Sequence, residues 1–185
     1  MSQFEFLTVM ISIVLAFGIS DILSSWGEQL RLRRSIRPYG LHLAWTALLL
    51  VAIILIWWSL WTLRDRETWT FPEYLLLIVP YLTASLMAYT LTPSLTDGDL
   101  DIKRYYYDNS RWFFSLAAFY QATWTILSVA VIHEPLIGST TGLRLAALGL
   151  MIGLAVSKNE RFHLAAVWAA SLMMTAHVAM NVFTL

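Results

Sequence analysis

Six long apolar segments constrain this chain more than any other feature of its sequence. They cover residues 6–25, 41–63, 73–92, 111–132, 142–156 and 161–182. A helix needs about 20 residues to cross the hydrocarbon core of a bilayer, and only the fifth segment is clearly shorter. We therefore predict an all-α fold, in which residues 1–185 form a single domain of six transmembrane helices joined by short loops.

The composition also indicates a multi-pass membrane protein. Of the 185 residues, 58% are hydrophobic and 13% are charged, whereas soluble proteins are about 45–50% apolar and about 25% charged. The net charge of +0 gives no overall field that would attract nucleic acid. The absence of cysteine excludes disulfides, thiolate nucleophiles and iron–sulfur clusters. We expect the lipid bilayer as the main partner and no nucleic-acid partner.

The basic side chains fall unevenly between the two sets of loops. Those near the turns after the first, third and fifth segments are Arg31, Arg33, Arg34, Arg37, Lys103, Arg104, Arg111, Lys158 and Arg161. Only Arg64, Arg66 and Arg144 fall on the other side. The positive-inside rule then predicts that both termini lie outside the cytoplasm. The short loops are similar to those of small bacterial inner-membrane proteins, so we expect a cell inner-membrane location.

Ionisable residues near the span ends form the first candidate site. Asp21 shares a helix stripe with Gly18 and Ser25, because residues three or four apart lie on one face. His42 and His163 begin the second and sixth segments at about the same cytoplasmic level. Since ionisable groups at membrane depth are costly without a partner, we predict a polar cluster of Asp21, His42 and His163. The alternative is three separate interfacial groups. We expect Asp21→Asn to cost more stability than His163→Ala.

Polar stripes inside three segments form a second candidate site. The candidate cavity-lining residues are Tyr81, Ser85, Tyr89, Gln121, Thr125, Ser128, His177 and Asn181. These side chains could line a solvated cavity. They could equally form interhelical hydrogen bonds, each contributing about 0.6 to 2 kcal/mol.

Small residues recur in the fifth segment. Gly149 and Gly153 lie four positions apart, a spacing that lets two helix backbones approach closely. We predict that this stripe packs against another helix of the bundle or mediates association with a second copy or a partner membrane protein.

Two histidines of the sixth segment, His163 and His177, lie on one helix face. The residues between them rise about 21 Å, so the two imidazoles approach opposite membrane surfaces. This spacing resembles the two-histidine helices of di-haem b-type cytochromes. The resemblance implies that His42 pairs with His163, and His133 with His177, as axial haem ligands. Without that haem b, we expect no cofactor.

Motifs for enzymatic chemistry are absent from the sequence. There is no HExxH, GxSxG, GxGxxG or P-loop pattern. Residues 97–108 place acids at calcium-loop positions, but Ile102 stands where the loop needs glycine, so we expect no metal site. We interpret the chain as a membrane-embedded interaction subunit or a small transport or channel unit. The alternative is a b-type electron carrier with bis-histidine haem.

Overall fold

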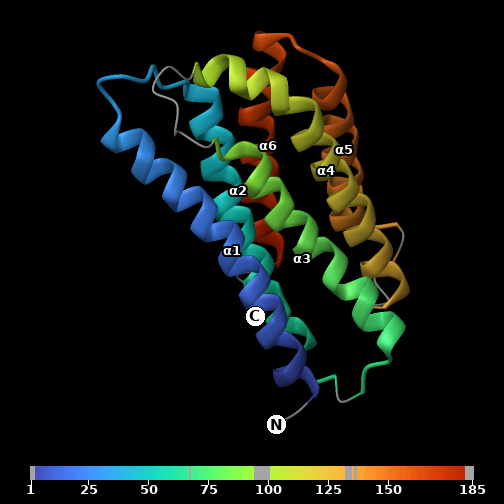
Figure 1. Ribbon diagram of the computed structural model, residues 1–185. Helices are drawn as coiled ribbons and strands as arrows, with labels where there is room; N and C mark the ends of the chain where they lie inside the picture. Colours follow the sequence, from blue (N-terminus) through green and yellow to red (C-terminus); the bar gives the residue numbers. More distant parts are fainter. Residues whose placement is uncertain (1–2, 67, 94–100, 132–134, 136, 182–185) are drawn as a thin grey trace.

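The computed structural model of this protein is all-helical, which confirms the predicted fold class (Figure 1). It describes residues 3–66, 68–93, 101–131, 135 and 137–181, and of Asn181 only the backbone. The elements are α1 (Gln3–Arg31), α2 (Gly40–Ser59), the 3₁₀ helix η1 (Leu60–Leu63), α3 (Phe71–Leu91), α4 (Ile102–Ala130), α5 (Ser139–Val156) and α6 (Glu160–Asn181). Each of the six α-helices, α2 together with η1, is long and apolar enough to cross a membrane.

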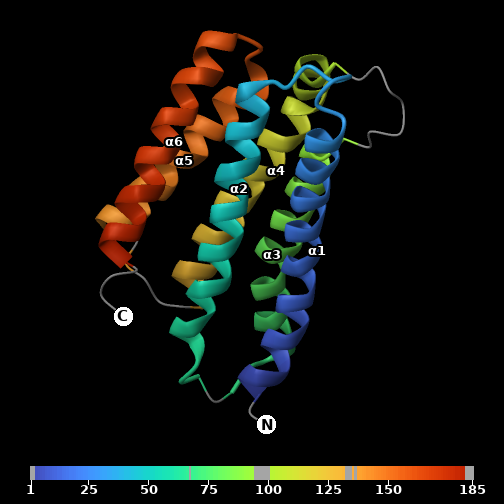
Figure 2. The ribbon, with the colours of Figure 1, turned by 90° about the vertical axis from the view of Figure 1, so that its left-hand side faces the viewer.

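The start of α1 and the end of α6 lie at the same end of the bundle, which we call the terminal end (Figures 1 and 2). The opposite end holds Arg31, Arg37, Lys103 and Lys158 near the turns between helices. We call it the basic end. Polar side chains form ion pairs and helix caps at both ends of the bundle. The helical segments between the two ends are mostly apolar.

Helix caps explain where α3 and α4 begin. Thr70 and Glu73 form a capping box at the start of α3, and Arg66 pairs with the Glu73 carboxylate. Asp101 caps α4 by accepting hydrogen bonds from the backbone N–H groups of Lys103 and Arg104, at 2.9 and 3.2 Å. α4 therefore begins well before the predicted span at 111 and carries residues 105–107 as helix.

The helices pack as a closed ring. α1 packs on α3, α3 on α4 and α4 on α5, while α6 contacts α5 and α2, and α2 returns to α1. Figure 2 shows the resulting layers, with α5 and α6 at one side and α1 and α3 at the other. Large apolar side chains such as Phe17, Leu86 and Trp168 remain exposed around the outside, at 66%, 54% and 67%. An apolar surface of this extent suits contact with lipid.

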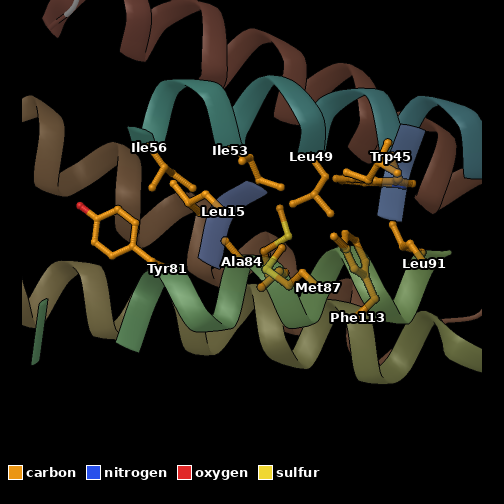
Figure 3. Packing of buried hydrophobic residues seen from close by; sticks show 14 of the residues in the cluster. Leu15, Trp45, Leu49, Ile53, Ile56, Tyr81, Ala84, Met87, Leu91 and Phe113 are labelled. Atoms are coloured by element: carbon orange, nitrogen blue, oxygen red, sulfur yellow. The ribbon is translucent and has the colours of Figure 1, made fainter. Parts of the chain in front are cut away.

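α1 and α3 approach each other closely at Gly18. The Ser85 hydroxyl donates to the Val14 carbonyl at 2.6 Å. A Cβ atom added to Gly18 would lie 3.2 Å from the Ser85 Cα atom, so a side chain at this position would crowd the α3 backbone. Toward the centre of the bundle, the buried side chains of α1, α2 and α3 interdigitate around Leu15, Ile53 and Ala84 (Figure 3).

Candidate functional site

His163 is the centre of a buried hydrogen-bonded cluster at the basic end. Its Nε2 atom lies 2.8 Å from the Ser157 carbonyl oxygen, and its Nδ1 atom lies 2.7 Å from the Tyr106 hydroxyl oxygen. Because a carbonyl only accepts hydrogen bonds, Nε2 carries the proton and Nδ1 accepts from Tyr106. The rings of Tyr106, Tyr107 and Phe114 surround the imidazole with centroids 5.4 to 5.6 Å away. Both nitrogens of His163 are thus satisfied.

The same end is tied together by a network of exposed and half-buried polar groups. The Tyr39 hydroxyl donates to the Glu160 carboxylate at 3.0 Å and lies 3.2 Å from the Tyr107 hydroxyl. The Lys103 ammonium pairs with Glu160 at 2.8 Å and lies over the Tyr39 ring. These contacts join the beginnings of α2, α4 and α6.

His42 lies at the same end but takes different partners. Its Nε2 atom is 2.6 Å from the Leu91 carbonyl oxygen, so this nitrogen donates, and its Nδ1 atom has no hydrogen-bond partner in the described part of the chain. The Tyr105 ring lies 6.4 Å away, and the Tyr105 hydroxyl donates to the Thr90 carbonyl at 3.2 Å. Consecutive helical residues point about 100° apart, so the hydroxyls of Tyr105, Tyr106 and Tyr107 have three different hydrogen-bond partners, which are Thr90, His163 and Tyr39.

Asp21 lies deeper along the bundle than the two histidines. Trp26 donates to Thr46 at 3.0 Å and Trp57 donates to Ser12 at 3.2 Å, which sets the register of α1 against α2. In that register Asp21 is about 11 Å along the axis from His42, at about 1.5 Å per residue. Among the residues that the structure describes, no hydrogen bond or ion pair joins Asp21 to either histidine. The structure brings His42 and His163 to one end and leaves Asp21 apart.

A half-open cavity of about 220 Å³ lies between α2, α4, α5 and α6, with a small contribution from α3. Most of its wall is apolar. Its polar side chains include Ser59, Tyr120, Gln121, Arg144 and His177. Gln121 and His177 are two of the residues that the sequence predicted to line a cavity, and Arg144 was not among them.

Arg144 lies more than one turn inside α5, because α5 begins at Ser139 and not at 142 as predicted. Its guanidinium donates to the Ser128 hydroxyl at 2.5 Å, and Ser128 donates onward to the Trp124 carbonyl at 2.8 Å. In the sequence analysis, Arg144 contributed only to the number of basic residues on the outer side of the membrane. The signal that could have found it is its place on an otherwise apolar helix, since arginine within a span faces protein or water.

The remaining predicted cavity residues serve other contacts. Thr125 donates to the Gln121 carbonyl of its own helix at 2.7 Å, Ser85 holds α1 against α3, and Tyr89 is 70% exposed. Tyr81 is fully buried beside Trp124, and its hydroxyl has no hydrogen-bond partner in the part of the chain described. The side chain of Asn181 lies outside the described residues.

The glycine stripe of α5 has different surroundings at its two positions. Nothing in the described chain comes within 4 Å of a Cβ atom added to Gly149, whereas one added to Gly153 would lie 3.3 Å from the Phe162 ring. Among the described residues, no neighbouring helix therefore packs against the open side of Gly149. Association through this residue with a second copy or a partner protein stays a prediction.

The four histidines predicted as haem ligands lie in different surroundings. His163 uses both ring nitrogens, His42 uses one, and His177 lines the cavity. His133 lies outside the described residues. Ligation by His163 would first require its hydrogen bond to Tyr106 or to Ser157 to break. The haem alternative stays a prediction.

The described residues contain no candidate metal site, because no three of their His, Asp or Glu side chains lie close enough together to hold an ion. Comparisons with protein-family models, curated proteins and solved structures found no match to this chain. The geometry of the bundle is therefore the basis for a functional assignment.

Proposed function

We propose that this protein is a small membrane-embedded binding and transport unit whose binding site is the half-open cavity. The observation that carries this proposal is the cavity of about 220 Å³, with a largely apolar wall and a few polar side chains. Binding sites for small molecules have this character, being largely apolar with a few polar groups that fix orientation. Arg144 supports the proposal further, because an ionisable residue within a span faces the bundle interior or a water-filled cavity and marks a candidate functional site.

A role as an interaction subunit has less support from the geometry. Gly149 is exposed on α5 and could meet a partner, but nothing at that surface indicates which partner. The b-type haem alternative is tested by the visible spectrum of protein purified from cells supplied with haem. Reduced b-type bands that disappear in His163→Ala would support it and would replace the transport proposal.

The cavity is tested by filling it. Ala117 lines the cavity, and Ala117→Phe should displace a bound molecule. Ala165→Phe is the matched control, because Ala165 is exposed on α6. We expect solvent extracts of the purified wild type and the control to contain a retained small molecule that the Ala117→Phe extract lacks. Equal retention in all three proteins, with unchanged melting temperatures, would contradict the proposal.

We further infer that the chain lies in a cell inner membrane with both termini outside the cytoplasm. The support is the excess of basic residues at the basic end, which the positive-inside rule places in the cytoplasm. Cysteine introduced at Ser35 or Ser157 should be protected from an impermeant thiol reagent in intact cells, whereas cysteine at Ser139 should react. Labelling at Ser35 from outside would reverse the orientation.

A further inference from the structure

The half-open cavity is elongated along the bundle axis. On α2 its wall runs from Trp45 to Ser59, a rise of about 21 Å. On α4 it runs from Phe113 to Trp124, a rise of about 16 Å. An elongated space of about 220 Å³ suits one extended chain.

The polarity of the wall changes along that axis. Ser59 lies at the end of α2, Arg144 near the start of α5 and His177 near the end of α6, so all three lie in the terminal half. Gln121 lies in the same half of α4. The wall of the basic half consists of apolar and aromatic side chains such as Leu49, Met87, Phe113 and Met151. Trp45 closes that half, with its ring edge-on to Phe113 and Phe114.

Methionine is prominent in the wall. Met87, Met151, Met173 and Met174 all line the cavity, although the whole chain contains only seven methionines. The unbranched thioether side chain adapts to irregular and flexible apolar partners. A wall of this kind suits a flexible hydrocarbon chain better than a rigid ligand.

We propose that the cavity binds a single-chain amphiphile, with its acyl or prenyl chain toward Trp45 and its head group toward Ser59, Gln121 and His177. This inference rests on the proposed function and names its ligand class. One leaflet of a bilayer spans only about half of the 30 Å hydrocarbon core, so a cavity about 21 Å long holds a fully extended lipid chain. The head group must accept a hydrogen bond, because the side-chain amide of Gln121 is a donor with no hydrogen-bond partner in the described part of the chain, whereas the Ser59 hydroxyl already donates to the Ile56 carbonyl at 2.7 Å.

Other occupants fit the wall less well. A peptide segment would leave its backbone N–H and C=O groups unsatisfied in the apolar half, at several kcal/mol each. A hydrated ion would lose its water there without replacement ligands. A lipid chain needs no hydrogen bond in that half. It can also come directly from the bilayer, beside α6, whose fully buried side chains are only His163 and Ala166 in the described part.

The test measures both chain-length dependence and orientation in detergent-purified full-length protein. We expect palmitate to bind and hexanoate to bind at least about tenfold more weakly, because the shorter chain leaves much of the apolar half unfilled. Ala117→Phe should weaken palmitate binding about tenfold, and Ala165→Phe should leave it unchanged within about twofold. Melting curves confirm that both variants fold.

Photo-crosslinking then reports the direction of the chain. A palmitate analogue with a diazirine at its terminal carbon should label the region of Trp45, Leu49 and Phe113. An analogue with the diazirine beside the carboxylate should label the region of Ser59 and His177. Reversed labelling, or equal binding of palmitate and hexanoate, would overturn the inference. If wild-type extracts nevertheless contain a molecule that Ala117→Phe lacks, the proposed function stands and only its ligand class is wrong.

Discussion

The two ends of the bundle use polar side chains in opposite ways. At the basic end, both nitrogens of the buried His163 imidazole are hydrogen-bonded. The aromatic rings of Tyr106, Tyr107 and Phe114 contact this imidazole. In the terminal half, Gln121 and Arg144 border a cavity. A buried, fully satisfied network fixes one packing arrangement, whereas polar groups beside a cavity are placed to meet a ligand.

On the proposed function, this difference separates residues that stabilise the fold from residues that bind. Substitutions in the His163 cluster should lower stability, because they leave buried partners without hydrogen bonds. Substitution of Gln121 in the cavity wall should change ligand retention with little effect on stability. The predictions below test this contrast in order of decreasing effect on stability.

Replacing His163 should have the largest effect. His163→Ala removes a fully buried ring and leaves the Tyr106 hydroxyl and the Ser157 carbonyl without their partner. We expect a loss of about 2–4 kcal/mol in the free energy of unfolding. Asp21→Asn is the control, because Asp21 has no hydrogen bond to either histidine. Denaturant unfolding in detergent measures both. An equal loss in the two variants would mean that the basic end is not the more rigid region.

From the sequence we expected Asp21→Asn to cost more stability than His163→Ala, and the structure leads to the opposite expectation. The reason is where α4 begins. The sequence predicted the all-helical fold with six helices long and apolar enough to cross a membrane, because long apolar segments are readily recognised in a sequence. It also indicated that His42 and His163 lie at one level. It did not reveal that α4 begins at Ile102, so Tyr106 fell outside the predicted span and nothing in the sequence indicated that it is the partner of His163.

The cavity wall was predictable only in part. Helical periodicity identified Gln121 and His177 as inward-facing, and both line the cavity. The same periodicity selected Ser85, which instead holds α1 against α3. Arg144 was not predicted as a cavity residue, because the predicted fifth helix began only two residues before it and placed it at the membrane surface. Which inward face meets a cavity depends on how the helices pack in three dimensions, and a single sequence does not contain that information.

The second prediction compares two glycines. Gly18→Leu should destabilise the bundle by about 1–3 kcal/mol, because its Cβ atom alone would press against the Ser85 backbone at 3.2 Å. Gly149→Leu should change the free energy of unfolding by less than about 0.5 kcal/mol, since nothing in the described chain lies near it. Thermal melting with size-exclusion chromatography measures both. A smaller particle for Gly149→Leu would show that the exposed stripe joins two copies.

The third prediction isolates one hydrogen bond of the His163 cluster. Tyr106→Phe keeps the ring contacts and removes only the hydroxyl that donates to Nδ1 of His163. We expect a loss of about 1–2 kcal/mol in the free energy of unfolding. Tyr89→Phe, at a 70% exposed position, should have no measurable effect. If the two variants melt at the same temperature, the Tyr106 hydroxyl does not stabilise the basic end.

The last prediction concerns Gln121, which lies in the terminal half of the bundle, away from the His163 cluster. Its side chain lines the cavity and has no hydrogen-bond partner in the described part of the chain, so Gln121→Leu removes no hydrogen bond of the amide to the described protein. We expect the free energy of unfolding to change by less than about 0.5 kcal/mol or to rise slightly, because leucine suits an apolar wall. Retention of the bound molecule should fall, because the head group loses one donor. A strongly destabilised Gln121→Leu would show that the terminal half is as tightly coupled as the basic end, and the distinction between stabilising and binding residues would then fail.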